Sequence, residues 1–499
     1  MKIKVLLISI IIPFVCFSQE YRYTNNQYAN STKISNVIYG NAPFINGPLH
    51  TVESSTTNKN LIMDIYQPTG DTFTLRPAII FAHPGGFLTG NRMVQDMNAL
   101  CDSLARKGYV TATIDYRKGF NLTSNQGIHS TRAVYRGIQD GRTAVRFLRA
   151  NASLYGIDPN KIYFVGSSAG SFIGLHSIYL DTPAEIPSQT GSVTYFNITP
   201  PFNHTAPNLG PLDIGTNLSF NGKPDAVVSM WGAIQNTTLI TADNSTPVLL
   251  IHGEDDATVS FDSGSPFGFS ALPVAYGSNA INTRLNQLGF TNHETYFVAG
   301  QDHEFHGTSN GTWDNGTGGN SFYPIIVNKV NQFLWKQHKP TADYNWTAST
   351  TDVSFTDTSS GSLAWWWDFG DGTFSNEQNP THIFLSPGDY SVKLYVENNI
   401  KSWDQITKTV TVSSLTTKTF DINSLNLFPN PATETIQVKW QSSNRAFYYR
   451  ILDVSGKSIY FNQMITNGEI ISLANLEKGL YFITFYQDDY TKTIKVIKN

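Results

Sequence analysis

Between residues 77 and 338, short apolar runs alternate with longer stretches of helical character, and this alternation restricts the fold more than any other feature. The short runs are apolar almost throughout, as expected for strands of a parallel sheet that helices cover on both faces. They occupy residues 77–82, 109–115, 161–166, 226–231, 247–252 and 294–299. The helical stretches occupy residues 92–107, 131–155, 169–180, 279–288 and 323–337. The pattern predicts a doubly wound α/β domain with a mostly parallel sheet.

The character of the chain changes after residue 339. Runs rich in Thr, Ser, Val and Tyr then alternate with turn residues, which is typical of a small β-sandwich, and a Ser- and Thr-rich linker leads into a final all-β segment. The 499 residues are also too many for one ordinary domain. We therefore expect an α/β domain over residues 19–339, a sandwich over 340–413 and a terminal β module over 419–499.

The first residues have the pattern of an export signal. Lys2 and Lys4 precede an apolar run and small residues before a cleavage point, which predicts a signal peptide of residues 1–18. A lipid-bearing Cys16 is a weaker alternative, because the residues before it do not form a lipobox. Cleavage would leave Cys101 as the only cysteine, so no intrachain disulfide is expected. No later apolar run reaches the length of about 18 residues that a membrane-spanning helix needs.

The charge composition argues against a nucleic-acid partner. The chain has 34 Lys and Arg against 38 Asp and Glu, a formal net charge of -4. A protein that grips phosphate backbones needs a basic face or stripe. We expect no nucleic-acid binding.

The pentapeptide Gly166-Ser167-Ser168-Ala169-Gly170 follows a predicted strand and opens a predicted helix. A nucleophilic serine on such a strand-to-helix turn is exposed, and the flanking glycines leave room for the backbone. The first N–H groups of the helix then face any oxyanion that develops there. Ser168 is therefore the candidate nucleophile.

A second loop, His83-Pro84-Gly85-Gly86-Phe87, follows an earlier predicted strand. It is similar to the His-Gly-Gly-Gly loop of lipases and carboxylesterases, whose backbone N–H groups bind the oxyanion. Proline has no N–H to donate, so Pro84 departs from that pattern.

A serine hydroxyl needs a base, and the base needs a carboxylate that fixes its tautomer. Two segments after strands supply the residue types in the order Asp then His. Asp255 and Asp256 follow one strand, and His303 and His306 follow the next. The carboxyl ends of such strands are where an open α/β sheet forms its site.

The run His303-Glu304-Phe305-His306 contains residue types that bind metal ions. The metalloprotease helix needs histidines four positions apart, and these two are three apart in a predicted loop. We expect no metal and no other cofactor.

Residues 75–338 resemble the α/β-hydrolase superfamily, in its carboxylesterase and hormone-sensitive-lipase-like branch. Besides the two loops, the chain shares Asp115-Tyr116-Arg117, and a block over residues 139–148 that continues through residues 155–159 into the serine turn. We interpret Asp115 and Arg117 as scaffold.

The resemblance decides between the neighbouring candidates. The family pattern His-Gly-x-x-Asp-x-x-Val selects Asp256, and the pattern Gly-x-x-His selects His303. The resemblance further implies that Gly85, Gly86 and Ala169 form the oxyanion hole.

An insertion of residues 181–223 is rich in Pro, Asn and aromatic residues, without clear periodicity. A segment of this length is either an active-site lid or a surface loop.

The last two segments also resemble known modules. Trp365-Trp366-Trp367-Asp368-Phe369-Gly370-Asp371-Gly372 and the residues that follow are similar to the PKD domain, an immunoglobulin-like sandwich. The blocks at residues 425–432, 451–457 and 476–482 are similar to the C-terminal sorting domain of the type IX secretion system. This resemblance implies the type IX machinery as a partner, and a secreted or surface-attached product.

Together these features predict a secreted serine carboxylic-ester hydrolase that acts through an acyl-enzyme on Ser168, with His303 as base and Asp256 as its partner. Acyl groups on polysaccharide, short-chain lipids and polyesters all remain compatible substrates. Two alternatives remain: a secreted peptidase with the same three residues, and a catalytically silent surface protein that binds glycans or acts in adhesion.

Overall fold

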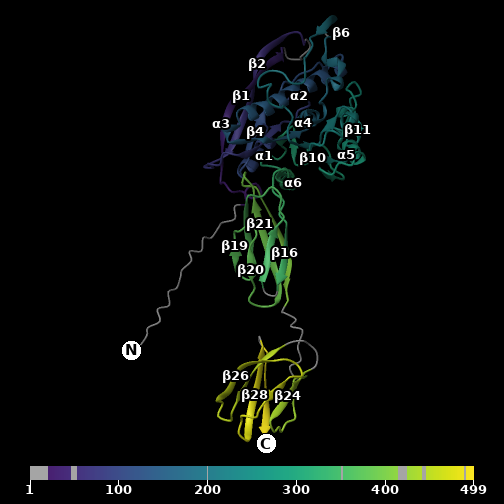
Figure 1. Cartoon of the computed structure of the whole chain (residues 1–499). Coiled ribbons are helices and arrows are strands. Elements are labelled where there is room, and N and C mark those ends of the chain that lie inside the picture. Colours follow the sequence, from purple (N-terminus) through teal and green to yellow (C-terminus); the bar gives the residue numbers. More distant parts are fainter. Residues whose placement is uncertain are drawn as a thin grey trace, which may run out of the picture. The chain divides into compact units, whose positions relative to one another are not determined.

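The computed structural model describes residues 21–46, 53–198, 201–349, 352–413, 424–440, 446–487 and 490–499 (Figure 1). The predicted signal peptide, residues 1–18, and the linker around residue 418 lie outside these ranges. In the part of the chain that is described, no helix is both long and apolar enough to cross a membrane.

The first domain is built on an eight-stranded sheet in the order β1-β2-β4-β3-β5-β8-β10-β13. Pairing is antiparallel between β1, β2 and β4 and parallel across the rest. The strands are β1 (Ser31–Ile45), β2 (Thr56–Pro68), β3 (Arg76–Ala82), β4 (Val110–Ile114), β5 (Ile157–Ser167), β8 (Ala226–Met230), β10 (Val248–Gly253) and β13 (His293–Val298). The predicted doubly wound sheet and its six parallel strands are confirmed. The antiparallel pair β1 and β2 was not predicted.

Helices cover both faces of this sheet because its strands are apolar on both sides. The helices are α1 (Gln95–Ala105), α2 (Gln126–Ala150), α3 (Ala152–Tyr155), α4 (Ala169–Tyr179), α5 (Ser278–Gln287) and α6 (Phe322–Lys336). They agree with the predicted helical stretches, except that α2 begins five residues earlier than expected. Ala78 and Ile80 of β3 pack into the core beneath α2, α4 and α5, and Ile79 and Phe81 pack into the core beneath α1 and α6.

Asp115 and Arg117 act as scaffold in the structure. The buried guanidinium of Arg117 forms an ion pair with the buried Asp140 of α2 at 2.8 Å. Asp115 accepts a hydrogen bond from Arg92 Nη1 at 2.6 Å. These pairs tie the segment after β4 to its neighbours.

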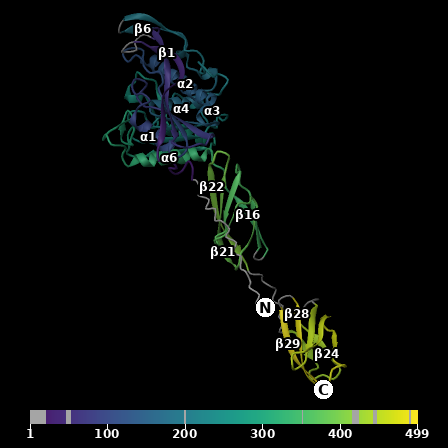
Figure 2. The ribbon, with the colours of Figure 1, turned by 90° about the vertical axis from the view of Figure 1, so that its left-hand side faces the viewer.

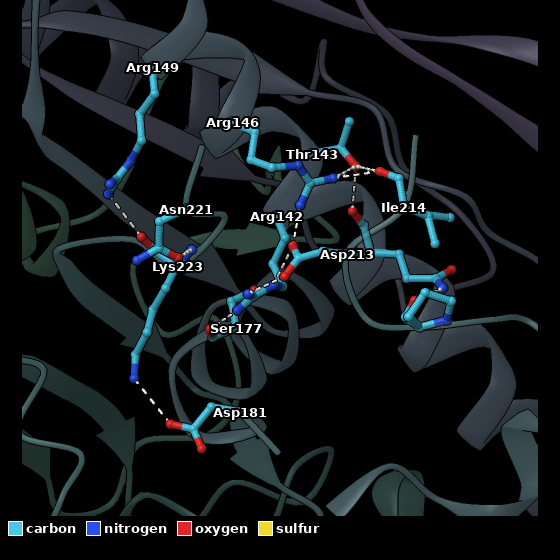
Figure 3. Close-up of polar contacts among 12 residues, drawn as sticks. Arg142, Thr143, Arg146, Arg149, Ser177, Asp181, Asp213, Ile214, Asn221 and Lys223 are labelled. Carbon is cyan, nitrogen blue, oxygen red and sulfur yellow. Dashed lines mark hydrogen bonds and ion pairs between the residues drawn. The ribbon is translucent and has the colours of Figure 1, made fainter. Parts of the chain in front are cut away.

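Arginines of α2 form ion pairs and hydrogen bonds with the insertion that follows α4. It contains the hairpin of β6 (Val193–Ile198) and β7 (Pro201–Ala206), which lies at the end of the domain away from α6 in both views (Figures 1 and 2). Arg142 and Arg146 both pair with Asp213, and Arg149 donates to the Lys223 carbonyl at 2.9 Å (Figure 3).

Short strands complete this domain. They are β9 (Ala233–Ile234), β11 (Ser263–Gly264), β12 (Ala275–Gly277), β14 (Thr308–Ser309) and β15 (Thr312–Trp313). The order β11-β12-β9 forms a small separate sheet.

The next segment is a β-sandwich, as predicted. One sheet has the order β16-β17-β20 and the other β19-β18-β21-β22. The strands are β16 (Tyr344–Ser349), β17 (Asp352–Asp357), β18 (Ala364–Asp368), β19 (Phe374–Ser375), β20 (Thr381–Ile383), β21 (Gly388–Glu397) and β22 (Trp403–Val412). Trp367 is fully buried against Tyr344 and Phe355, so this tryptophan is a core residue.

The C-terminal segment is all-β, as predicted. Its sheets have the orders β23-β24-β27 and β26-β25-β28-β29 around one apolar core. The strands are β23 (Asn426–Phe428), β24 (Thr435–Lys439), β25 (Phe447–Leu452), β26 (Ser458–Ile465), β27 (Ile470–Ser472), β28 (Gly479–Gln487) and β29 (Tyr490–Lys498).

Candidate active site

Ser168 occupies a sharp turn between β5 and α4. Its φ of +51° lies in the left-handed region, which a residue with a side chain rarely adopts. The flanking glycines make the turn possible: a Cβ on Gly166 would stand 2.2 Å from the Gly170 carbonyl carbon, and one on Gly170 would stand 2.1 Å from the Ala82 carbonyl oxygen. The turn therefore directs the serine away from the sheet while the backbone stays closely packed.

The three side chains singled out from the sequence form one hydrogen-bonded chain. His303 Nε2 lies 2.9 Å from Ser168 Oγ, and His303 Nδ1 lies 2.7 Å from Asp256 Oδ2. Asp256 follows β10 and His303 follows β13, so the paired strands bring the two loops together. A histidine with its Nδ1–H on a carboxylate presents an unprotonated Nε2 to the hydroxyl.

Asp256 is held in its ionised form by donors. Burial alone would raise the pKa of this carboxyl, but hydrogen bonds from His252 and His303 outweigh it and lower the pKa below its ordinary value. The backbone N–H groups of Thr258 and Val259 also donate to Oδ1, each at 2.8 Å. The carboxylate is thus negative throughout the pH range in which a histidine titrates.

Sequence reasoning missed two residues that support these loops. The buried His252 places Nε2 3.1 Å from Asp256 Oδ2, while its Nδ1 lies 2.8 Å from Ser278 Oγ. Asp302 accepts hydrogen bonds from the N–H groups of Ala257, at 2.9 Å, and of its own neighbour His303, at 2.7 Å. His252 is the histidine of the His-Gly-x-x-Asp pattern, so this pattern could have identified it from the sequence.

Asp255 and His306, the two candidates that the family patterns did not select, lie outside this hydrogen-bonded chain. Asp255 is exposed, and its backbone N–H donates to Gln301. His306 is buried, stacks on Trp231 and contacts Asp96 at 3.2 Å. Among the described residues, no three His, Cys, Asp or Glu side chains form a group suited to a metal ion.

The loop after β3 has the backbone conformation of a tight glycine turn. Gly85 and Gly86 have φ of +120° and +58°, and Gly86 faces the same pocket as Ser168 and Ala169. His83 lies buried below the loop, stacked on Tyr116, and burial lowers its pKa to about 3. It is therefore a neutral structural residue.

Ser168 opens into an apolar pocket of about 720 Å³, its solvent-open mouth included. None of the described residues that line it is Asp, Glu, Lys or Arg. His176, which is among the lining residues, has its Nδ1 2.7 Å from the carbonyl of Phe172 and accepts from the Gln235 N–H, and burial lowers its pKa to about 4. Of the described part of the insertion at 181–223, no residue lines this pocket; much of the wall comes from residues 259–275. That the insertion is a lid stays a prediction.

Comparison with known proteins agrees with this architecture. Residues 63–267 match the BD-FAE family, residues 338–413 the PKD domain and residues 426–499 the secretion system C-terminal sorting domain. The chain thus joins an α/β-hydrolase-fold domain similar to the BD-FAE family, a PKD domain and a C-terminal sorting domain. The sorting domain marks it for type IX secretion to the cell surface or the extracellular space.

Individual relatives match part of the chain. Carboxylesterase 3B of Mus musculus is 34% identical over 122 residues, which is 24% of this chain and 20% of the relative. Neuroligin-like protein glit-1 of Caenorhabditis elegans is 33% identical over 119 residues, 23% of this chain and 16% of the relative. The chain thus spans a fifth or less of the length of these two curated relatives. The apo form of Thermogutta terrifontis esterase 2 is 18% identical, with a TM-score of 0.39, over 60% of this chain and 93% of that one.

Proposed function

We propose that the first domain is a serine carboxylic-ester hydrolase in which Ser168 is the nucleophile, His303 the general base and then acid, and Asp256 the group that orients His303. The strongest support is the continuous hydrogen-bonded chain of 2.9 Å and 2.7 Å through these three side chains on the left-handed serine turn. Relatives named as esterases support the reaction class.

The reaction proceeds in two halves. Ser168 Oγ attacks the ester carbonyl carbon while His303 Nε2 takes its proton, and the tetrahedral intermediate collapses to an acyl-enzyme. The departing alcohol receives that proton from His303. Water then attacks the acyl-enzyme with His303 again as base, and this releases the carboxylic acid and free Ser168.

The oxyanion in each half is stabilised by backbone N–H groups. Ala169 stands in the first turn of α4, where N–H groups have no intrahelical acceptor. Gly85 and Gly86 are the further donors in this proposal, since their loop lies beside the serine turn and Gly86 shares the pocket with Ser168.

The pocket favours esters of uncharged, apolar acyl groups. Its lining is largely aliphatic and aromatic, and a charged group placed there would lose its hydration without a partner. His176 is held neutral, so it offers no cation for a carboxylate.

Hydrolysis of p-nitrophenyl esters from acetate to palmitate tests the reaction. The purified protein should cleave esters of this series, and Ser168→Ala should lose about 10³-fold or more in kcat/KM. A wild type no faster than Ser168→Ala on every ester would contradict the proposal and favour a silent binding protein. Cleavage of peptide amides in preference to esters would favour a peptidase.

The sorting domain is, in the same proposal, the part that the type IX secretion machinery recognises. Removal of residues 424–499 should leave the hydrolase inside the producing cell, while the full chain reaches the outside. Equal export of both forms would contradict this.

A further inference from the structure

Residues 259–275 form an arm that closes one side of the pocket. The arm leaves the loop of Asp256 and returns through β11 and β12, and β12 pairs with β9. Its pocket-lining residues are Val259, Pro266, Phe267, Leu272, Pro273, Val274 and Ala275. The arm therefore supplies a larger share of the wall than any other continuous segment.

Phe267 stands at the tip of this arm, against the oxyanion loop. A Cβ added to Gly86 would meet Phe267 Cζ at 3.0 Å, so the ring touches the backbone of a proposed oxyanion donor. The N–H of Phe267 donates to the Thr258 carbonyl at 2.7 Å, and its φ of +60° is unusual for a bulky residue. The ring is 56% exposed, so burial in the protein core does not explain its position.

In the proposed reaction the pocket would receive the acyl group of the ester. Gly86 and Ala169, the proposed donors to the ester carbonyl oxygen, line it. His303, which would protonate the departing alcohol, is not among the described residues that line it. An acyl group bound there would place the carbon next to its carbonyl near the ring of Phe267.

Resting on the proposed hydrolase function, we propose that Phe267 is a specificity-determining residue that admits linear acyl chains and rejects chains branched next to the carbonyl. A substituent on that carbon would occupy the space that the ring fills beside Gly86. Straight chains can instead continue past the ring along the apolar lining.

The test compares kcat/KM for p-nitrophenyl trimethylacetate and p-nitrophenyl acetate in matched variants. Trimethylacetate carries three methyl groups where acetate carries hydrogens, so Phe267→Ala should raise the ratio of the branched to the linear ester by about 10-fold or more, the lower end of what a single methylene is worth in a fitted pocket. Phe267→Leu should give an intermediate ratio. Phe269→Ala is the control, because Phe269 belongs to the same arm and is 45% exposed but does not line the pocket.

A ratio unchanged in both Phe267 variants, with acetate still cleaved, would overturn the role of Phe267 and leave the hydrolase proposal intact. An equal change in Phe269→Ala would also overturn it, since the effect would then belong to the arm as a whole. Failure of the wild type to exceed Ser168→Ala on any ester would instead overturn the hydrolase function, and this inference with it. Thermal unfolding of each variant should match the wild type, because both rings are exposed.

Discussion

The Nε2 atom of His252 lies 3.1 Å from Oδ2 of Asp256. The same oxygen accepts the Nδ1–H of His303, so one carboxylate oxygen serves two histidines. Two oxygen atoms lie near His252 Nε2, namely Asp256 Oδ2 and the Val259 carbonyl oxygen. Because both accept hydrogen bonds, a neutral His252 carries its proton on Nε2. His252 and His303 thus share Asp256 Oδ2 as a hydrogen-bond acceptor.

Replacing His252 should therefore lower catalysis with little effect on substrate binding. His252→Gln weakens donation to Asp256, so the carboxylate is held less firmly where it orients His303. We expect kcat to fall while KM stays close to the wild-type value. Ser278→Ala, which removes the hydroxyl facing His252 Nδ1, should lower kcat through the same contact. An unchanged kcat in both variants would contradict this positioning role.

The pair Asp255 and Asp256 provides a matched comparison of adjacent residues. Asp256→Asn should lower kcat by about 10⁴-fold, because an amide favours the wrong histidine tautomer. Asp255 is exposed and lies outside the hydrogen-bonded chain, so Asp255→Asn should stay within about two-fold of the wild type. Equal losses in the two variants would show that the orienting carboxylate has been misassigned.

The buried Glu304, next to His303 in sequence, should make stability depend on pH. Burial, together with the nearby charge of Asp96, raises its pKa to about 8 from 4.5. The folded state then binds the proton more tightly than the unfolded state. The free energy of unfolding should fall as pH rises from 4.5 to about 8, because ionisation is penalised only in the folded state. Urea unfolding across this range should show a smaller decrease for Glu304→Gln, and identical slopes would contradict the expectation.

Two ion pairs of different burial should differ in their contribution to stability. Asp140→Asn leaves the buried guanidinium of Arg117 without its counter-charge, and we expect a loss of about 3–5 kcal/mol in urea unfolding. The pair of Lys336 and Glu294 is 48% and 39% exposed, so Glu294→Gln should cost less than about 1 kcal/mol. A similar loss for both would mean that Asp140 is not a structural anchor.

The central strands of the sheet could be predicted from the sequence because the parallel strands are fully buried. A run such as residues 247–252 is apolar on both faces, and only a covered parallel strand suits it. The edge strands are different: β1 is largely exposed, and its pairing with β2 has two irregularities, so its residues show no steady alternation. Such strands are fixed by tertiary pairing more than by local pattern.

The site shows the same division. Ser168 could be predicted from the sequence because the tight turn between β5 and α4, formed by residues close in sequence, requires its motif. The role of His252 depends on the turn at residues 256–259, which brings Asp256 back onto it. The arm of Phe267 rests on strands of two and three residues, too short for any periodicity to mark.

Covalent labelling of the full protein with an alkyl fluorophosphonate tests the central claim most directly. In this reaction Ser168 Oγ bonds to phosphorus, fluoride leaves, and His303 takes the serine proton. Mass spectrometry should find one adduct per chain, mapped to Ser168, and labelling should be abolished in Ser168→Ala and strongly slowed in His303→Ala. An unlabelled wild type, or an adduct at another residue, would contradict the assignment of Ser168 as an activated nucleophile.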